Sequence, residues 1–111
     1  ESQEISDNGI KNLCVRGIHY LKSLVTLKLN FSECPKITGE GLKILCFEGI
    51  RHLRFLTILH FNFSGCEEIK DEDFEYLKQI LKYFGHKVYN IQKPRFYSNY
   101  NMTCNNDYMD M

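Results

Sequence analysis

An internal repeat is the feature of this 111-residue chain that most limits how it can fold. When residues 4–34 are shifted by 32 positions, they align without a gap on residues 36–66, and 14 of the 31 pairs are identical. The most visible part is the pentapeptide NFSEC at residues 30–34, which returns as NFSGC at residues 62–66. A fixed period of this length is typical of proteins that stack small supersecondary units. We therefore expect the two segments to fold alike and to lie side by side.

Each unit changes its hydrophobic period halfway, from the period of a helix to the period of a strand. In the first half, apolar and small residues recur at spacings of three and four, as on the buried face of an amphipathic helix. These residues are Ile10, Leu13, Cys14, Gly17, Ile18 and Leu21 in the first unit, and Leu42, Leu45, Cys46, Gly49, Ile50 and Leu53 in the second. Ser6 and Thr38 stand where helix N-caps are expected. Each unit is thus predicted to begin with a capped helix.

The second half of each unit alternates apolar and polar residues, which predicts a short strand with one apolar face. Together with the cysteines that follow, the inward residues of these strands are predicted to form the repeat core. They are Leu27, Leu29, Phe31, Cys34, Leu59, Phe61, Phe63 and Cys66. A helix followed by a strand in every unit favours an α/β fold with a parallel sheet.

A third copy begins at Ile69 and loses the pattern after Ile91. At the same 32-residue shift, Val88 and Ile91 align with Leu56 and Leu59. The chain then becomes polar and rich in Asn and Tyr. We predict two parts, a repeat region over residues 1–92 and a C-terminal tail over residues 93–111 that has neither helical nor strand periodicity.

The pattern LxxLxLxFxxCxxIT, which begins at Leu24, resembles leucine-rich repeats of the cysteine-containing subclass. The stretch ITGEGLKIL at residues 37–45 is similar to the segment that opens the convex helix in that subclass. The resemblance covers about residues 4–92. It implies a leucine-rich-repeat solenoid with short parallel strands and convex helices, built from two full 32-residue repeats and a degenerate third.

The resemblance also implies that the polar side of the strands is a concave surface used for protein recognition. The predicted partner-binding residues are Thr26, Lys28, Asn30, Ile58, His60, Asn62, Asn90 and Gln92. The 32-residue shift orders them in three rows across the sheet, namely Thr26/Ile58/Asn90, Lys28/His60/Gln92 and Asn30/Asn62. The alternative is that these residues form only a solvated face. A second candidate surface is the helical stretch IRHLRFL at residues 50–56.

The duplicated pentapeptide also permits other interpretations. Cys34 and Cys66 are candidate metal ligands or disulfide partners, but the chain has five cysteines and no Cys-x-x-Cys pair. Asn30 and Asn62 each open an N-glycosylation sequon, as does Asn101 in the tail. Because the whole unit is duplicated together with the pentapeptide, we favour core thiols for the cysteines. The same duplication makes the first two sequons weak predictions.

Composition and motifs argue against several classes of function. Fourteen basic residues balance fourteen acidic ones, which gives no electrostatic reason to expect a nucleic acid as partner. No apolar run approaches the roughly 20 residues that span a bilayer. We find no arrangement of residues that indicates catalysis, a metal or another cofactor, so the chain is predicted not to be an enzyme.

The predicted partners are other proteins, and the predicted location is the cytoplasm, in association with an assembly or the cytoskeleton. The leading prediction is a protein-interaction or scaffold module, either part of a longer repeat protein or a subunit docked in a large intracellular assembly. One alternative is the substrate-recognition part of an F-box-type ubiquitin-ligase adaptor. Another is an accessory repeat region of an enzyme whose catalytic domain lies outside this chain.

Overall fold

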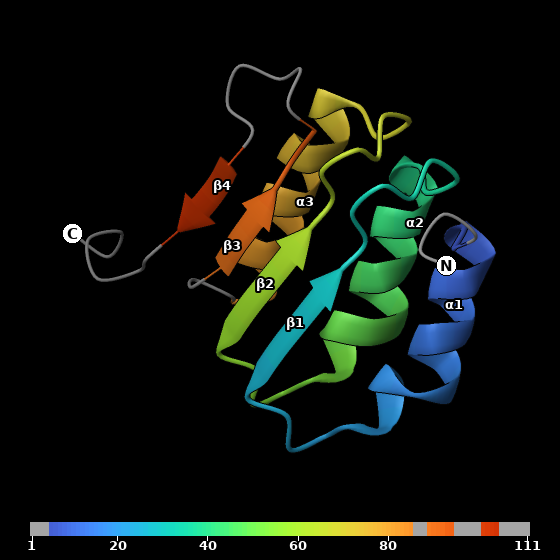
Figure 1. Cartoon of the computed structure of the whole chain (residues 1–111). Helices are drawn as coiled ribbons and strands as arrows, with labels where there is room; N and C mark the ends of the chain where they lie inside the picture. Colours follow the sequence, from blue (N-terminus) through green and yellow to red (C-terminus); the bar gives the residue numbers. More distant parts are fainter. Residues whose placement is uncertain (1–4, 86–88, 95–100, 105–111) are drawn as a thin grey trace.

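A single four-stranded sheet organises the chain, in the order β1-β2-β3-β4. The computed structural model describes residues 5–85, 89–94 and 101–104. The strands are β1 (Thr26–Asn30), β2 (Ile58–Asn62), β3 (Tyr89–Gln92) and β4 (Asn101–Cys104). The first three are parallel, and β4 runs antiparallel to β3 (Figure 1). The strands predicted in the second half of each repeat unit are confirmed as β1 and β2.

Three α-helices form a second layer on one face of the sheet (Figure 1). They are α1 (Asp7–Arg16), α2 (Gly39–Ile44) and α3 (Asp71–Tyr83), with α2 packed between the other two. Short helical turns extend the first two helices toward the strands, namely η2 (Ile18–Tyr20), η3 (Leu45–Gly49) and η4 (Ile50–His52). In the part of the chain that the structure describes, no helix covers the opposite face of β1 to β3.

The predicted N-caps Ser6 and Thr38 are both confirmed. The Ser6 side chain accepts a hydrogen bond from the Gly9 N–H at 3.4 Å, and the Thr38 hydroxyl accepts from the Glu40 N–H at 3.1 Å. Thr38 in turn donates to the carboxylate of Asp7, through its N–H at 2.8 Å and through its hydroxyl at 2.6 Å. Asp7 lies in the first turn of α1. The start of α1 is thereby joined to the start of α2 by two hydrogen bonds.

The apolar residues of both layers form one continuous core. Of the eight residues predicted for the repeat core, the structure buries seven, and Leu29 is half-buried against the same core. Phe31 and Phe63 stack with their ring centroids 5.6 Å apart. The equivalent aromatic side chains of the two sequence copies are therefore direct neighbours.

The predicted leucine-rich-repeat solenoid is wrong. The structure is a small compact α/β domain with three α-helices and three parallel strands, to which β4 adds an antiparallel edge. Its radius of gyration is 13.2 Å, close to the about 13 Å typical of a compact domain of roughly this length. The sequence duplication is real, but it is accommodated within one two-layer unit with a shared core. A repeat in the sequence therefore does not require an elongated solenoid.

The predicted rows across the sheet are correct for the first two strands and wrong for the third. Thr26 pairs with Ile58, at the 32-residue shift, but Leu59 pairs with Tyr89, at a shift of 30. The connection from the third helix to its strand is thus two residues shorter than its counterpart in the second unit. Consequently Asn90 lies beside His60, and Gln92 lies beside Asn62.

Part of the predicted tail belongs to the sheet. β4 lies within residues 93–111 and pairs along β3, although no strand was predicted there. Lys93 is also buried, and its ammonium group contacts the Asp71 carboxylate at 3.0 Å and lies 5.7 Å from the Phe74 ring centroid. Residues 95–100 and 105–111, to which the tail prediction also refers, lie outside the described residues.

Candidate functional site

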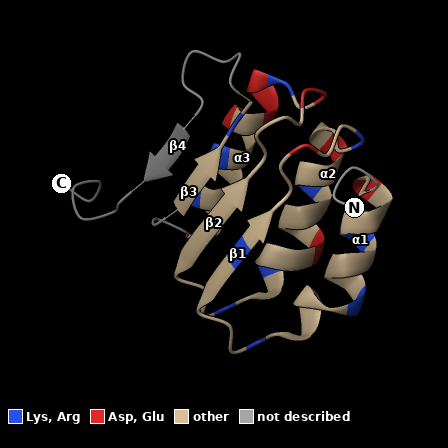
Figure 2. Cartoon of the chain, viewed as in Figure 1, with Lys and Arg blue, Asp and Glu red and all other residues tan. Residues whose placement is uncertain are grey.

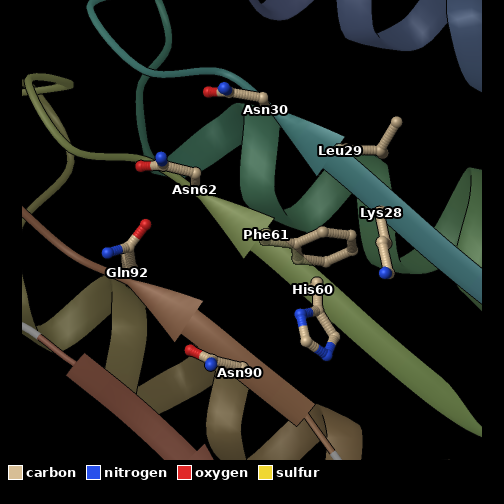
Figure 3. Close-up of a pocket in the computed structure, with 8 residues that line it drawn as sticks. All are labelled: Lys28, Leu29, Asn30, His60, Phe61, Asn62, Asn90 and Gln92. Carbon is tan, nitrogen blue, oxygen red and sulfur yellow. The ribbon is translucent and has the colours of Figure 1, made fainter.

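An open hollow of about 360 Å³ lies on the helix-free face of β1 to β3 (Figure 3). Its lining includes six of the eight residues predicted to bind a partner. These are Lys28, Asn30, His60, Asn62, Asn90 and Gln92. Because alternate residues of a strand point to opposite faces, the same pattern that buries the core places these six on the open side.

The strand register arranges the six side chains in two rows. Lys28, His60 and Asn90 form one row, and Asn30, Asn62 and Gln92 form the other, at the carboxyl ends of the strands. Neighbouring strands are about 4.8 Å apart, so each row presents hydrogen-bonding groups at closely spaced points.

The other two predicted residues, Thr26 and Ile58, pair with each other near the amino ends of the strands and do not line the hollow. Thr26 is exposed and Ile58 is half-buried. In their place the floor of the hollow includes Leu29 and Phe61, which were predicted only as core residues. The alternation along β1 and β2 indicates that these two residues separate the polar ones and that their side chains point toward the helices.

Asn30 and Asn62 have a structural role that the sequence analysis missed. Asn30 Oδ1 accepts a hydrogen bond from the Ser32 N–H at 2.9 Å. Asn62 Oδ1 accepts from the Ser64 N–H at 2.9 Å and from the Ser64 hydroxyl at 2.8 Å. Each asparagine thus forms an Asx turn that ends its strand. The spacing Asn-x-Ser directly after a predicted strand is the signal from which these turns could have been found.

The rest of the duplicated pentapeptide continues this turn. Glu33 and Gly65 both have positive φ, at 60° and 83°, a conformation that glycine adopts easily and other residues rarely adopt. The Cys66 thiol donates a hydrogen bond to the main-chain oxygen of Phe31 at 3.0 Å, across the two copies. Cys34 and Cys66 are both buried as thiols, and burial raises the pKa of Cys66 to about 11. These features place both thiols in the core and not in a disulfide.

Charged residues are distributed unequally along the strands. β1, β2 and β3 contain no Asp or Glu, and Figure 2 shows acidic residues gathered at the turns and helix starts beyond their carboxyl ends. Lys22 and Arg54 lie in the connections that lead into β1 and β2. The hollow itself has one formal positive charge, that of Lys28, and no formal negative charge.

The second predicted surface, residues 50–56, borders a separate hollow of about 310 Å³. Arg51 and Arg54 line it together with Phe84 and Gly85, which directly follow α3. Phe55 does not line this hollow and is 65% exposed. This hollow is lined by two polar side chains, whereas six line the hollow on the sheet face.

No protein-family model, curated protein or solved structure matches this chain. The resemblance to leucine-rich repeats thus remains a prediction from the quoted motifs. None of the helices within the described ranges has the length and apolar character needed to cross a membrane.

Proposed function

We propose that this chain is a non-catalytic protein-interaction module that binds its partner with the open face of β1 to β3. The observation that supports the proposal is the hollow lined by six polar side chains from three adjacent strands. The helix layer holds these strands from the other side, so the side chains project from a rigid support. Little conformational entropy is lost when such groups bind a partner.

The chemistry of the lining supports binding better than it supports a reaction. Four of the six polar side chains are carboxamides, and the remaining two are Lys28 and His60. Carboxamides form directed hydrogen bonds without titrating, which suits recognition of main-chain and side-chain groups of another protein.

Site-specific photo-crosslinking tests the proposal. A photoreactive amino acid at Gln92, which is exposed on the sheet face, should form a discrete adduct with a partner in an extract of the source cells. The matched control has the same amino acid at Lys78, which is exposed on α3 in the helix layer. Unlabelled chain should suppress the adduct, whereas unlabelled chain with Lys28→Glu and Asn90→Lys should not. An adduct that forms only from position 78 would move the binding surface to the helices and reject the proposal.

A further inference from the structure

The two Asx turns determine which atoms of the sheet face remain available to a ligand. In Asn30 and Asn62 the carboxamide oxygen accepts a hydrogen bond from a main-chain N–H group. The NH₂ group of a carboxamide can only donate, so it cannot take the place of the oxygen in these bonds. The Nδ2 groups are therefore the free ends, and no described residue accepts a hydrogen bond from them. At two adjacent points the row presents hydrogen-bond donors.

The neighbouring row adds to this excess of donors. Lys28 is exposed and forms no hydrogen bond or ion pair with any residue that the structure describes. Its ammonium group can only donate, and it lies beside the exposed His60. No carboxylate lines the hollow to balance the lysine. Asn90 and Gln92 offer both a donor and an acceptor, and so does the neutral imidazole of His60, so the groups that can only donate are Lys28 and the two Nδ2 groups.

From this balance we infer that the hollow recognises an extended acidic segment of the partner protein. The inference rests on the proposed function and specifies the class of its ligand. Side-chain carboxylates would accept hydrogen bonds from Lys28 and His60, and main-chain carbonyl groups would accept from the Nδ2 groups of Asn30 and Asn62. Charge-assisted hydrogen bonds of this kind are stronger than those between neutral groups.

The charges around the hollow also orient the segment. The turns beyond the asparagine row expose three carboxylates and two ammonium groups, so their net negative charge disfavours carboxylates there; these residues are Glu33, Glu67 and Glu68, and Lys36 and Lys70. Lys22 and Arg54 precede the strands at the opposite end. The acidic side chains should therefore lie over the Lys28 row, toward the amino ends of the strands, and not over the carboxyl ends.

Fluorescence anisotropy with labelled peptides tests this specificity. Peptides of about eight residues are long enough to cross three strands, since an extended chain advances about 3.3 Å per residue and strands are about 4.8 Å apart. A peptide of alternating Glu and Thr should bind the full chain, and added salt should weaken the binding. The matched Gln/Thr and Lys/Thr peptides should bind at least about tenfold more weakly.

Two variants connect the binding to the hollow. Asn62→Asp keeps an oxygen in place for the Asx turn but replaces the donor with a negative charge, so the Glu/Thr peptide should lose about tenfold in affinity without loss of thermal stability. Lys28→Glu should weaken binding by a similar factor. The charge-matched control Lys78→Glu changes an exposed lysine in the helix layer and should leave the affinity unchanged.

The outcomes separate this inference from the proposed function. If the Gln/Thr peptide binds as tightly as the Glu/Thr peptide, or if inorganic phosphate displaces the Glu/Thr peptide completely, recognition of an acidic segment is rejected. The crosslink from position 92 would still support a protein-binding face in that case. If Lys78→Glu weakens binding as much as Lys28→Glu, the interaction is non-specific attraction to the whole protein, and the inference is likewise rejected.

Discussion

Leu13 and Leu45 occupy equivalent positions in the two copies of the sequence repeat, yet Leu13 is 40% exposed and Leu45 is completely buried. The same holds for Leu21, which is 47% exposed, and its equivalent Leu53, which is 2% exposed. The helix of the second copy lies between α1 and α3, whereas α1 has a helical neighbour on one side only within the described chain. Identical residues thus acquire different environments from their place in the helix layer.

The difference does not extend to every residue of the first copy. Ile10 and Cys14 face the second copy and are as deeply buried as their equivalents Leu42 and Cys46. The first copy therefore contains residues whose substitution should affect stability as much as substitution of their counterparts, and exposed residues whose substitution should affect it less. Substitutions at equivalent positions of the two copies test this division.

Truncation of the equivalent leucines should give the largest contrast. Leu45→Ala opens a cavity in the core and should lower the free energy of unfolding by about 3 kcal/mol, within the range typical of buried leucines. Leu13→Ala removes a side chain that is already half in water and should cost less than about 1 kcal/mol. Urea denaturation of the two variants provides the measurement. Similar losses in both would mean that the outer side of α1 is covered in solution.

The cysteines of the two helices, in contrast, should behave alike in alkaline solution. Burial raises the pKa of Cys14 to about 11 and that of Cys46 to about 12, from an ordinary value of 9.0. The Glu48 carboxylate adds to the shift of Cys14, and Cys14 adds to the shift of Cys46. The unfolded thiols lose their protons near pH 9, whereas the folded ones keep them. Their contribution to stability is thus complete below pH 9 and is lost as the pH rises through the folded values, by on the order of 1 kcal/mol per thiol between about pH 9 and pH 10.

Urea unfolding between about pH 8 and pH 10 measures this loss. Cys14→Ala and Cys46→Ala should each reduce the pH dependence by a similar amount, whatever their effect on stability at neutral pH. Thiolate absorbance from the folded protein near pH 10 that is absent from folded Cys14→Ala or Cys46→Ala would contradict the prediction, because it would show that these thiols ionise without unfolding.

The turn after each strand allows a smaller test, at Glu33 and Gly65. Both residues have positive φ, where an L side chain costs about 1 kcal/mol. A β-carbon on Gly65 would also lie 2.7 Å from the Glu33 carboxylate, which must move aside. Gly65→Ala should therefore lower the free energy of unfolding by about 1 kcal/mol. Glu33→Gly should change it by less than about 0.5 kcal/mol, since relief of backbone strain offsets the entropy of the new glycine. Thermal unfolding of both variants measures these changes. An equal loss of stability in the two variants would refute the argument from backbone strain.

Local features could be predicted from the sequence because local chemistry determines them. The hydrophobic periods identified β1, β2 and most of the buried residues, but they wrongly placed Leu13 and Leu21 on a buried face. The hydroxyl side chains of Ser6 and Thr38 located two helix starts. The compact shape could not be predicted from the repeat, because equal units are compatible with different overall architectures. The register of β3 depends on a connection two residues shorter than its counterpart, and a fixed 32-residue shift conceals this difference.

In the candidate site, too, the sequence pattern predicts which residues are on the open face but not how their atoms are oriented. The alternation along the strands placed Lys28, His60 and Asn62 on the open face, as the structure does. Which end of the Asn62 carboxamide faces outward depends on the main-chain turn at Ser64, and no hydrophobic pattern encodes that turn. The donor character of the face therefore follows from the Asn-x-Ser turns and their hydrogen bonds, and not from the hydrophobic pattern.

The two asparagines provide the finest comparison between the copies. Asn62 Oδ1 accepts two hydrogen bonds and Asn62 is half-buried, whereas Asn30 Oδ1 accepts one and Asn30 is exposed. Asn62→Ala should thus lower the free energy of unfolding by about 1 kcal/mol and Asn30→Ala by about 0.5 kcal/mol, as measured by urea denaturation. Ser64→Ala removes only the additional hydroxyl donor and should account for the difference, because the Ser64 N–H bond to Asn62 remains. If Ser64→Ala has no effect while Asn62→Ala still costs more than Asn30→Ala, the difference between the copies comes from burial and not from the second hydrogen bond.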